Sequence, residues 1–314
     1  RPRFANLFAT VNTCVETYEK KLSMHHGHIS AIHLLIALAL AVSTQVRALD
    51  HAIAQAPLDK FDKLQDYNYA LLHAALVASE AKFGGFKLER SLQVMQRDRQ
   101  FTQVEKGKSL TILVSPPKKE WRNKLLRVPF PIQRGVSGYR LFFVMEQNKN
   151  ILASIKSLEE LKMIPTGSNA SWSTTSILRD HGFNVVTSQG YKTLFDMLAK
   201  GRFATLGRGL NEIPIELRLF SKEFPSLTFD EHIVLYTFLP NYYYVSPDQP
   251  QLATRLEFGL KALHASGELD RLFNIYYGHQ MKRFDISSRR KFVIENTNLE
   301  AGMYEHDKPY LLNF

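Results

Sequence analysis

A guanidinium and a carboxylate stand just after one short apolar segment, where a protein can contact a polar solute. Residues 203–206 are too short and too apolar for anything but a buried strand, and a polar cluster follows: Gly207, Arg208, Gly209, Asn211 and Glu212. In open α/β sheets, ligands bind beyond the carboxyl ends of the strands. Arg208 and Glu212 are therefore candidate ligand-binding residues, with a salt bridge between the two as the alternative.

An amphipathic helix precedes this strand and must position it. Leu194, Met197 and Leu198 recur at i, i+3 and i+4, which predicts one apolar helical face. Lys200 gives the last turn a basic residue, and Gly201 can adopt the positive φ at which many helices end.

Strands and helices alternate along the rest of the chain. This alternation is typical of an α/β fold in which a parallel-type sheet has helices on both faces. The predicted strands are 51–56, 86–95, 110–114, 139–145, 185–186, 233–237 and 242–245, and the predicted helices are 69–81, 97–106, 158–161, 173–181, 215–220, 250–266 and 269–277.

The composition indicates a globular protein large enough for two lobes. The chain has 314 residues, of which 45% are hydrophobic and 22% charged. Its formal net charge is +10; residues 1–48 hold five basic and two acidic residues, so the remainder carries +7. The basic residues are scattered, with the tightest runs at 118–119 and 289–291. Nucleic-acid binding is not expected, because it needs basic and aromatic residues clustered on one element.

The N-terminal part has the pattern of a secretion signal. Residues 31–42 form an apolar run too short to span a bilayer, and Ala48 ends a segment that suits cleavage by a signal peptidase. Met24 is the natural start. We therefore expect an upstream extension at 1–23, as a mis-called start or an untranslated leader, and a signal peptide at 24–48 that is cleaved after Ala48. A short membrane anchor or a buried helix is the alternative.

Cysteine and histidine usage excludes several kinds of site. The only cysteine, Cys14, precedes the predicted mature chain, so we expect no disulfide, zinc knuckle or thiol nucleophile there. The histidines after residue 48 show no metal-ligand spacing. We expect neither a metal nor a cofactor, and the export signal predicts a location in the periplasm of a double-membraned bacterium.

Six segments, taken in chain order, are similar to the motifs of one known family. Arg122 precedes 128–131 at the spacing from that family's ligand arginine to its Phe-Ser-x-Pro segment. The other similarities are a short helix at 158–162, a glycine-bearing loop at 166–168, a Leu-x-x-Gly-Arg stretch at 194–203 and the final helices at 250–272. Across 49–285 the chain resembles the type II periplasmic solute-binding proteins, nearest the amino-acid-binding (family 3) branch of ABC transporter receptors.

The resemblance implies a periplasmic-binding-protein-like II fold, with two α/β lobes joined by a two-strand hinge. Lobe one would be 49–138 plus 246–314, and lobe two would be 139–245. The tail after Arg283 lies outside the family pattern and is expected to form a partly ordered strap over lobe one.

The first crossing between the predicted lobes holds the hinge candidates Gly135, Gly138 and Tyr139. A hinge needs a few residues that absorb a change in φ and ψ, and glycine does so at least steric cost. The alternative is that the two glycines are plain turn formers.

In lobe one, the resemblance assigns the ligand's α-carboxylate to Arg122. A guanidinium can bind a carboxylate through two charge-assisted hydrogen bonds, and the neighbouring Trp121 would add an aromatic wall. The alternative for Arg122 is a solvated arginine on a helix.

In lobe two, the candidates open the helix predicted at 173–181. Ser171, Trp172, Ser173 and Thr174 would offer hydroxyls and free helix N–H groups to an anionic group. The alternatives are an N-cap role for Ser173 or Thr174 and a core role for Trp172. Three tyrosines could stack on or hydrogen-bond a ligand, although tyrosines at strand ends are common: Tyr67, Tyr191 and Tyr242.

The chain departs from the family pattern at the site. Ala204 replaces the family's aspartate after Gly-Arg, and Pro116 and Pro117 replace the Ser/Thr residues that usually precede the ligand arginine. An ordinary α-amino acid therefore loses part of its recognition. Arg122 and Arg208 together favour an acidic or dianionic solute, unless a carboxylate neutralises Arg208.

The expected function is capture of a small polar, anionic solute between the lobes and delivery to the membrane permease of an ABC-type transporter. The main alternative is a periplasmic ligand-sensing protein that feeds a separate signalling partner. A dehydratase-like enzyme on the same fold is a further alternative, and it would need Glu212 as its general acid. We do not expect an enzyme.

Overall fold

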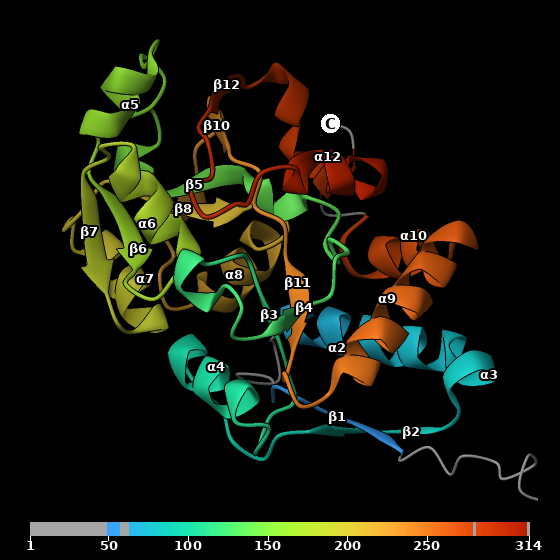
Figure 1. The fold of residues 1–314 in the computed structure, drawn as a ribbon. Helices are drawn as coiled ribbons and strands as arrows, with labels where there is room; N and C mark the ends of the chain where they lie inside the picture. Colours follow the sequence, from blue (N-terminus) through green and yellow to red (C-terminus); the bar gives the residue numbers. More distant parts are fainter. Residues whose placement is uncertain (1–48, 57–62, 279–280, 313–314) are drawn as a thin grey trace, which may run out of the picture. The chain divides into compact units, whose positions relative to one another are not determined.

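The computed structural model of the protein describes residues 49–56, 63–278 and 281–312 (Figure 1). The predicted upstream extension and signal peptide at 1–48 lie outside the described residues. In the part of the chain that is described, no helix combines the length and apolar character needed to cross a membrane.

Two small sheets are built from the early strands and one late strand. β1 and β2 pair in parallel, whereas β3 and β4 flank β11 and run antiparallel to it. Thr111 connects the two sheets, because its N–H donates to Ile53 O at 3.1 Å and its Oγ1 accepts from Ile53 N at 2.8 Å. The strands are β1 Asp50–Ala54, β2 Phe86–Arg90, β3 Ile112–Ser115, β4 Leu126–Arg127 and β11 Tyr242–Val245.

The largest sheet has the order β12-β10-β5-β8-β6-β7, and β9 also pairs with β5. β5 runs antiparallel to β8, β9 and β10, whereas β6 runs parallel to β7 and β8, so the sheet is mixed. The strands are β5 Tyr139–Met145, β6 Thr166–Asn169, β7 Val185–Ser188, β8 Thr205–Gly209, β9 Leu227–Phe229, β10 Ile233–Tyr236 and β12 Arg290–Val293.

Helices pack on the sheets and on one another, and α2 lies beside α9 (Figure 1). A Cβ on Gly259 of α9 would lie 2.0 Å from Ala75 O of α2, so only glycine permits this approach. The helices are α2 Lys63–Ala78, α3 Glu80–Phe83, α4 Arg97–Glu105, α5 Leu158–Met163, α6 Ser173–Asp180, α7 Tyr191–Ala199, α8 Ile213–Phe220, α9 Pro250–Ala265, α10 Glu268–Phe273 and α12 Met303–Asp307. Short helical turns are η1 Lys119–Trp121, η2 Val136–Gly138, η3 Glu146–Asn148, η4 Asn274–Gly278, η5 Lys282–Phe284, η6 Ile286–Ser288 and η7 Lys308–Tyr310.

Most predicted elements are confirmed within a few residues. The strand predicted at 139–145 has the bounds of β5, and α7 ends as expected at Lys200 and Gly201, with Gly201 at φ 66°. Gly182 follows α6 at φ 78° in the same way.

Two segments cross between the small sheets and the largest sheet, and they touch at Gly138. Thr237 N donates to Gly138 O at 3.1 Å, and Ile132 N donates to Asn241 O at 2.9 Å. A Cβ on Gly138 would lie 2.3 Å from Thr237 O, so the glycine is required by this close approach. Gly135 has φ 77° and precedes η2, which is a turn-forming role. The hinge role of Gly135, Gly138 and Tyr139 stays a prediction.

The expected loop at 166–168 is wrong, because these residues belong to β6. A Cβ on Gly167 would lie 2.3 Å from the ring of Phe203, so this glycine makes room for a side chain rather than for a turn. The strand predicted at 203–206 is also shifted: β8 includes Arg208, which was expected to follow the strand. Glycine weakens a strand interior, so Gly207 and Gly209 on either side of Arg208 give no strand signal in the sequence.

The tail after Arg283 does not form a strap over the predicted lobe one alone. β12 extends the largest sheet by pairing in parallel with β10, whose backbone groups would otherwise form an open edge. Next along the tail, Glu295 O lies 2.8 Å from His181 Nε2, beside the end of α6. Farther on, Asp307 accepts a hydrogen bond from the Tyr242 hydroxyl on β11. The tail is thus joined to both groups of strands.

Candidate functional site

A cavity of about 250 Å³ is lined by residues from both groups of strands. Gln55 follows β1 and Pro116 follows β3, whereas Asn169 ends β6 and Arg208 lies near the end of β8. The carboxyl ends of four strands therefore meet at this cavity, which is the usual position of a ligand site in α/β sheets.

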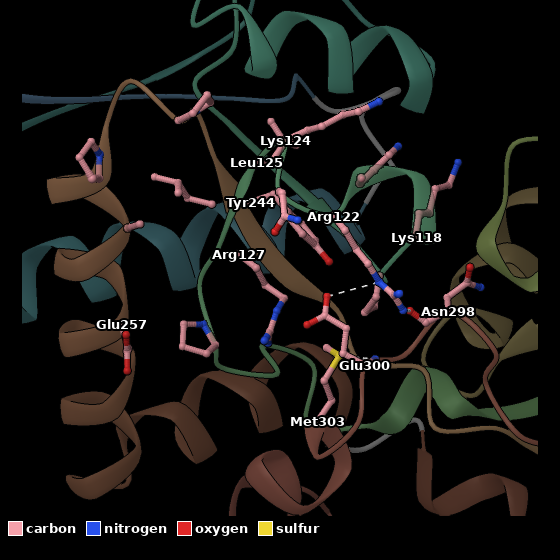
Figure 2. A pocket seen from close by; sticks show the side chains of 18 of the residues that line it. Lys118, Arg122, Lys124, Leu125, Arg127, Tyr244, Glu257, Asn298, Glu300 and Met303 are labelled. Carbon is pink, nitrogen blue, oxygen red and sulfur yellow. Dashed lines mark hydrogen bonds and ion pairs between the residues drawn. The ribbon is translucent and has the colours of Figure 1, made fainter.

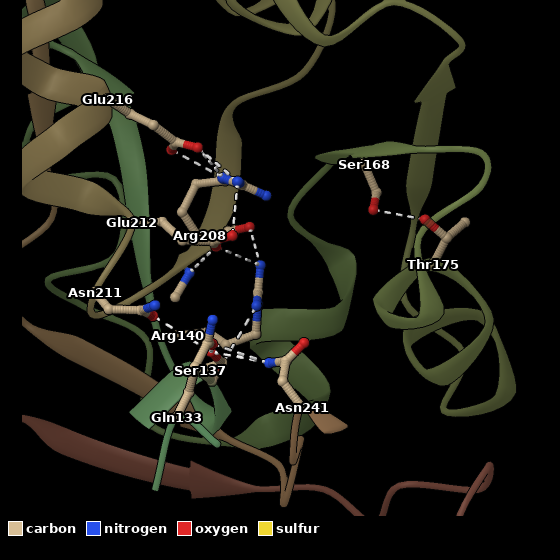
Figure 3. A network of polar contacts seen from close by, with 12 residues as sticks. Gln133, Ser137, Arg140, Ser168, Thr175, Arg208, Asn211, Glu212, Glu216 and Asn241 are labelled. Carbon is tan, nitrogen blue, oxygen red and sulfur yellow. Dashed lines mark hydrogen bonds and ion pairs between the residues drawn. The ribbon is translucent and has the colours of Figure 1, made fainter. Parts of the chain in front are cut away.

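Arg208 is held by two carboxylates at the cavity wall (Figure 3). Its Nε lies 2.8 Å from both carboxylate oxygens of Glu216, and its Nη2 lies 2.9 Å from Glu212 Oε1. The Trp172 ring covers the guanidinium, with the ring centroid 4.1 Å from Cζ. Tyr191 donates its hydroxyl to Glu216 Oε1 at 2.6 Å. The two carboxylates hold the pKa of Arg208 above its ordinary value in spite of burial.

The salt-bridge alternative for Arg208 and Glu212 is thus present in the structure, with Glu216 as the closer partner. Glu212 also accepts from Gly209 N at 2.6 Å. Burial opposes ionisation of Glu212, but Arg208 and Arg140 outweigh it and hold the pKa of this carboxyl below its ordinary value of 4.5. A general acid must carry a proton near neutral pH, so the position of Glu212 does not favour the acid role of a dehydratase-like enzyme.

Arg140 and Arg97 bring further positive charge to the cavity. Arg140 donates to Gly207 O at 2.6 Å and lies 4.0 Å from Glu212 Oε2, and burial lowers its pKa to about 10. Arg97 at the start of α4 donates to Ser115 Oγ at 3.4 Å. Within the described residues, three arginines and two glutamates line the cavity, and no carboxylate lies within ion-pair distance of Arg97. The wall therefore has one positive charge in excess.

Two buried polar side chains at the cavity have atoms without a hydrogen-bond partner in the described part of the chain. Gln55 is 6% exposed, and neither its amide nitrogen nor its amide oxygen is bonded. Ser173 is 3% exposed, and its hydroxyl is also unbonded. Buried polar groups are costly when unpaired, so both groups would gain from a polar ligand or water in the cavity.

The residues predicted at the start of α6 all line this cavity, together with Tyr191 at the start of α7. Trp172 occupies the N-cap position, and Ser173 is the first helical residue. The alternative of Ser173 or Thr174 as the N-cap is therefore wrong. Ser171 is committed to its own loop, since its N–H and hydroxyl donate to Asn169 Oδ1 at 3.0 and 2.8 Å. Ser173 and Thr174 are thus better placed than Ser171 for a ligand.

Arg122 and Trp121 line a different cavity, away from the residues around Arg208. Arg122 binds the tail, with Nη2 3.1 Å from Leu299 O and Nε 3.5 Å from Glu300 Oε1. Trp121 is buried and stacks on Phe101 at a centroid distance of 4.9 Å. The structure therefore does not bring Arg122 together with Arg208. Asn123 at φ 61° turns the chain directly after Arg122, a feature that the sequence spacing did not reveal.

Tyr67 and Tyr242 are core residues in the structure. Tyr67 is fully buried and donates its hydroxyl to Ile132 O at 2.7 Å. Tyr242 is also fully buried, with its hydroxyl bonded to Asp307. Neither lines the cavity beside Arg208, so of the three tyrosines only Tyr191 lies at that wall.

Four residues that the account of the site uses were not expected from the sequence: Gln55, Arg97, Arg140 and Glu216. Glu216 lies one helical turn beyond Glu212, and this spacing could have indicated a second carboxylate on the same face of α8. Arg140 is the single charged residue in an otherwise apolar strand, which was a signal for a buried charged contact. Gln55 carried no signal, because a glutamine after a strand is common.

No family model matches the chain, and no curated protein matches it either. An ancestral arginine-binding protein bound to arginine has 16% sequence identity and a TM-score of 0.52, over 73% of this chain and 98% of that chain. A structure from work on glutathione import through GshT and the cystine ABC importer TcyBC of Streptococcus mutans has 14% identity and a TM-score of 0.54, over 74% and 96%. A histidine kinase sensor domain with similarity to periplasmic binding proteins has 15% identity and a TM-score of 0.53, over 73% and 96%.

At these identities the likeness concerns the fold. It agrees with the mixed sheet flanked by helices. The chain has the α/β fold of the periplasmic-binding-protein-like II class, as the sequence predicted.

Proposed function

We propose that the protein is an extracytoplasmic solute-binding protein, which holds a small polar molecule with an anionic group in the cavity beside Arg208. The observation that carries the proposal is the pair Gln55 and Ser173, whose buried polar atoms are unpaired within the described residues. Gln55 follows β1 of a small sheet, and Ser173 begins α6 beside the largest sheet. A ligand that bonds to both would satisfy one group on each wall.

The size and charge of the cavity define the ligand class. A volume of about 250 Å³ lies at the lower end of ligand pockets, so the solute is small. Arg208 is already neutralised by Glu212 and Glu216, which makes it part of the wall rather than the main ligand contact. The excess positive charge comes from Arg97 and Arg140, and it favours one anionic group on the solute.

Closure around the solute would use the two crossing segments. The proposed lobes are 49–138 plus 246–314 and 139–245, except that β12 pairs with β10 and would move with the second lobe. The contact of Gly138 with Thr237 gives the two crossings one shared point, about which a small change in φ and ψ would move the groups of strands.

We further propose that the bound solute is delivered to a membrane permease. The fold also occurs in a sensor domain, so a signalling partner is the second candidate. Genes for a permease and an ATPase next to this one would support uptake. A neighbouring kinase or cyclase gene in their place would support sensing.

A ligand screen tests the binding function itself. The full chain is heated with amino acids, di-acids, sugar acids and aromatic acids, and the melting temperature is recorded for each class. A true ligand at about 100 times its Kd stabilises the folded state by about 2.7 kcal/mol, which is a shift of several degrees. The shift should shrink in Ser173→Ala, which removes one unpaired hydroxyl and leaves the wall otherwise intact. If no class shifts the melting temperature, the binding proposal is wrong.

A further inference from the structure

A second and larger cavity, of about 620 Å³, is built around the segment that holds Arg122 (Figure 2). Its walls come from residues 117–129, from 244–257 at the end of β11 and the start of α9, and from 298–303 in the tail. The cavity beside Arg208 shares no lining residue with it, although Pro116 of that cavity and Pro117 of this one are neighbours in the chain. The tail thus closes one wall of a separate site.

Among the described residues that line this cavity, Arg127 and Lys124 have no carboxylate within ion-pair distance, and Arg127 is the one that extends beside Glu300. It lies on β4, and its guanidinium stacks on Tyr242, with Cζ 4.9 Å from the ring centroid. Among the described residues, its side chain has no hydrogen-bond acceptor and no carboxylate within ion-pair distance. The contact with the ring engages none of the N–H groups in a hydrogen bond to a described acceptor, so they are left for a ligand. The Tyr242 hydroxyl is anchored on Asp307, so this orientation is held by packing.

The two carboxylates of the cavity do not neutralise Arg127. Glu300 is paired with Arg122 at 3.5 Å, and Glu257 is paired with Lys261 at 2.6 Å. Figure 2 shows Arg122 and Arg127 extending to either side of Glu300, whereas the amino groups of Lys118 and Lys124 point away from it. One positive charge therefore remains at the centre of the site.

The floor of the cavity is apolar. Leu125, Tyr244 and Met303 are buried and line it. A ligand seated here would place an anionic group on Arg127 and an uncharged body on these side chains. We propose that the cavity is a second binding site, for small carboxylic acids with an aromatic or alkyl body. This inference is independent of the solute proposed for the cavity beside Arg208.

The two tryptophans of the chain allow each cavity to be followed separately. Trp121 lines the larger cavity and Trp172 lines the smaller one. In Trp172→Phe, the fluorescence emission of the remaining Trp121 should change as phenylacetate is added and should reach a plateau. In Trp121→Phe, phenylacetate should leave the emission of Trp172 unchanged. Inorganic phosphate and succinate, which lack an apolar body, should bind at least tenfold more weakly to the larger cavity.

Arg127→Gln in the Trp172→Phe background should weaken phenylacetate binding at least tenfold. Lys124→Gln removes the same charge from the rim and should change the affinity less than twofold. Arg127→Lys keeps the charge but loses the planar edge of the guanidinium. Its affinity for phenylacetate should lie between those of the other two variants. Equal effects of the Arg127 and Lys124 substitutions would overturn the proposal, because they would indicate a nonspecific charge effect. A saturable response of Trp172 in place of Trp121 would also overturn it.

Discussion

Arg208 Nε lies 2.8 Å from both carboxylate oxygens of Glu216, and both side chains are almost fully buried. This pair determines the role of Arg208 in the cavity. A guanidinium with two carboxylate partners and an aromatic cover has few donors left for a solute. In the proposed function, ligand recognition would therefore fall to the unpaired polar groups Gln55 and Ser173 and to the arginines with weaker partners, Arg97 and Arg140.

Glu216→Gln should destabilise the protein by about 3 kcal/mol. Breaking a buried ion pair from one side leaves a buried charge with fewer partners, and Glu212 compensates only in part. Urea unfolding followed by circular dichroism measures the change. Glu268→Gln is the matched control, because Glu268 pairs with Arg271 on the surface, and its unfolding midpoint should stay at the wild-type value. A wild-type midpoint for Glu216→Gln would contradict the buried pair.

The contribution of Glu212 should depend on pH in the acid range. Its folded-state pKa lies below the ordinary value of 4.5, because Arg208 and Arg140 outweigh burial. As the pH falls, the unfolded chain therefore protonates Glu212 before the folded protein does. The stability that ionised Glu212 contributes is complete above pH 4.5 and is lost as the pH falls through the folded-state pKa. The difference in unfolding free energy between wild type and Glu212→Gln should be constant above pH 4.5 and should shrink below it. A difference that grows on acidification would disprove the assigned direction.

Most elements could be predicted from the sequence because their signals are local. The apolar periodicity of 194–198, the glycine at Gly201 and the apolar run of β5 each depend on a few neighbouring residues. Gly167 and Gly138 could not be assigned in this way. Gly167 is required because the ring of Phe203 packs against it, and Gly138 is required because the carbonyl group of Thr237 approaches it. Both neighbours come from distant segments of the chain.

The candidate site was also predicted only in part, because some of its residues depend on distant segments rather than on local signals. The start of α6 and Arg208 were found from helix-start and strand-end signals, and they line one cavity. Arg122 was placed by its spacing to 128–131, but spacing carries no information on the turn at Asn123 or on the tail that binds Arg122. Glu216 matters through its ion pair with Arg208, and Gln55 through its buried and unbonded position at the cavity; only the folded chain creates either.

Gly138→Ala should destabilise the protein by about 1–3 kcal/mol. The added Cβ would lie 2.3 Å from Thr237 O, which is backbone and can move only if a crossing segment shifts. The measurement is thermal or urea unfolding. Gly85→Ala is a suitable comparison, because its Cβ would meet only the flexible end of Leu49 at 3.2 Å. Equal stability of the two variants would show that the crossings do not touch at Gly138.

Tyr242→Phe should lower the unfolding free energy by about 1–3 kcal/mol, because it leaves Asp307 buried with one partner fewer. The ring that supports Arg127 is kept. Since Tyr242 does not line the cavity beside Arg208, the affinity for the solute should stay at the wild-type value. Titration calorimetry with the solute found in the screen checks this point, and a tenfold loss of affinity would restore Tyr242 as a ligand residue.

Gln55→Leu tests the solute-binding claim most directly, because it replaces two unpaired buried polar atoms with an apolar side chain that is only slightly smaller. The ligand-free variant should be at least as stable as the wild type, since an apolar group replaces an unsatisfied amide. The same variant should lose at least tenfold in affinity for the solute by titration calorimetry. Unchanged affinity together with lower stability would contradict the assignment of this cavity as the binding site.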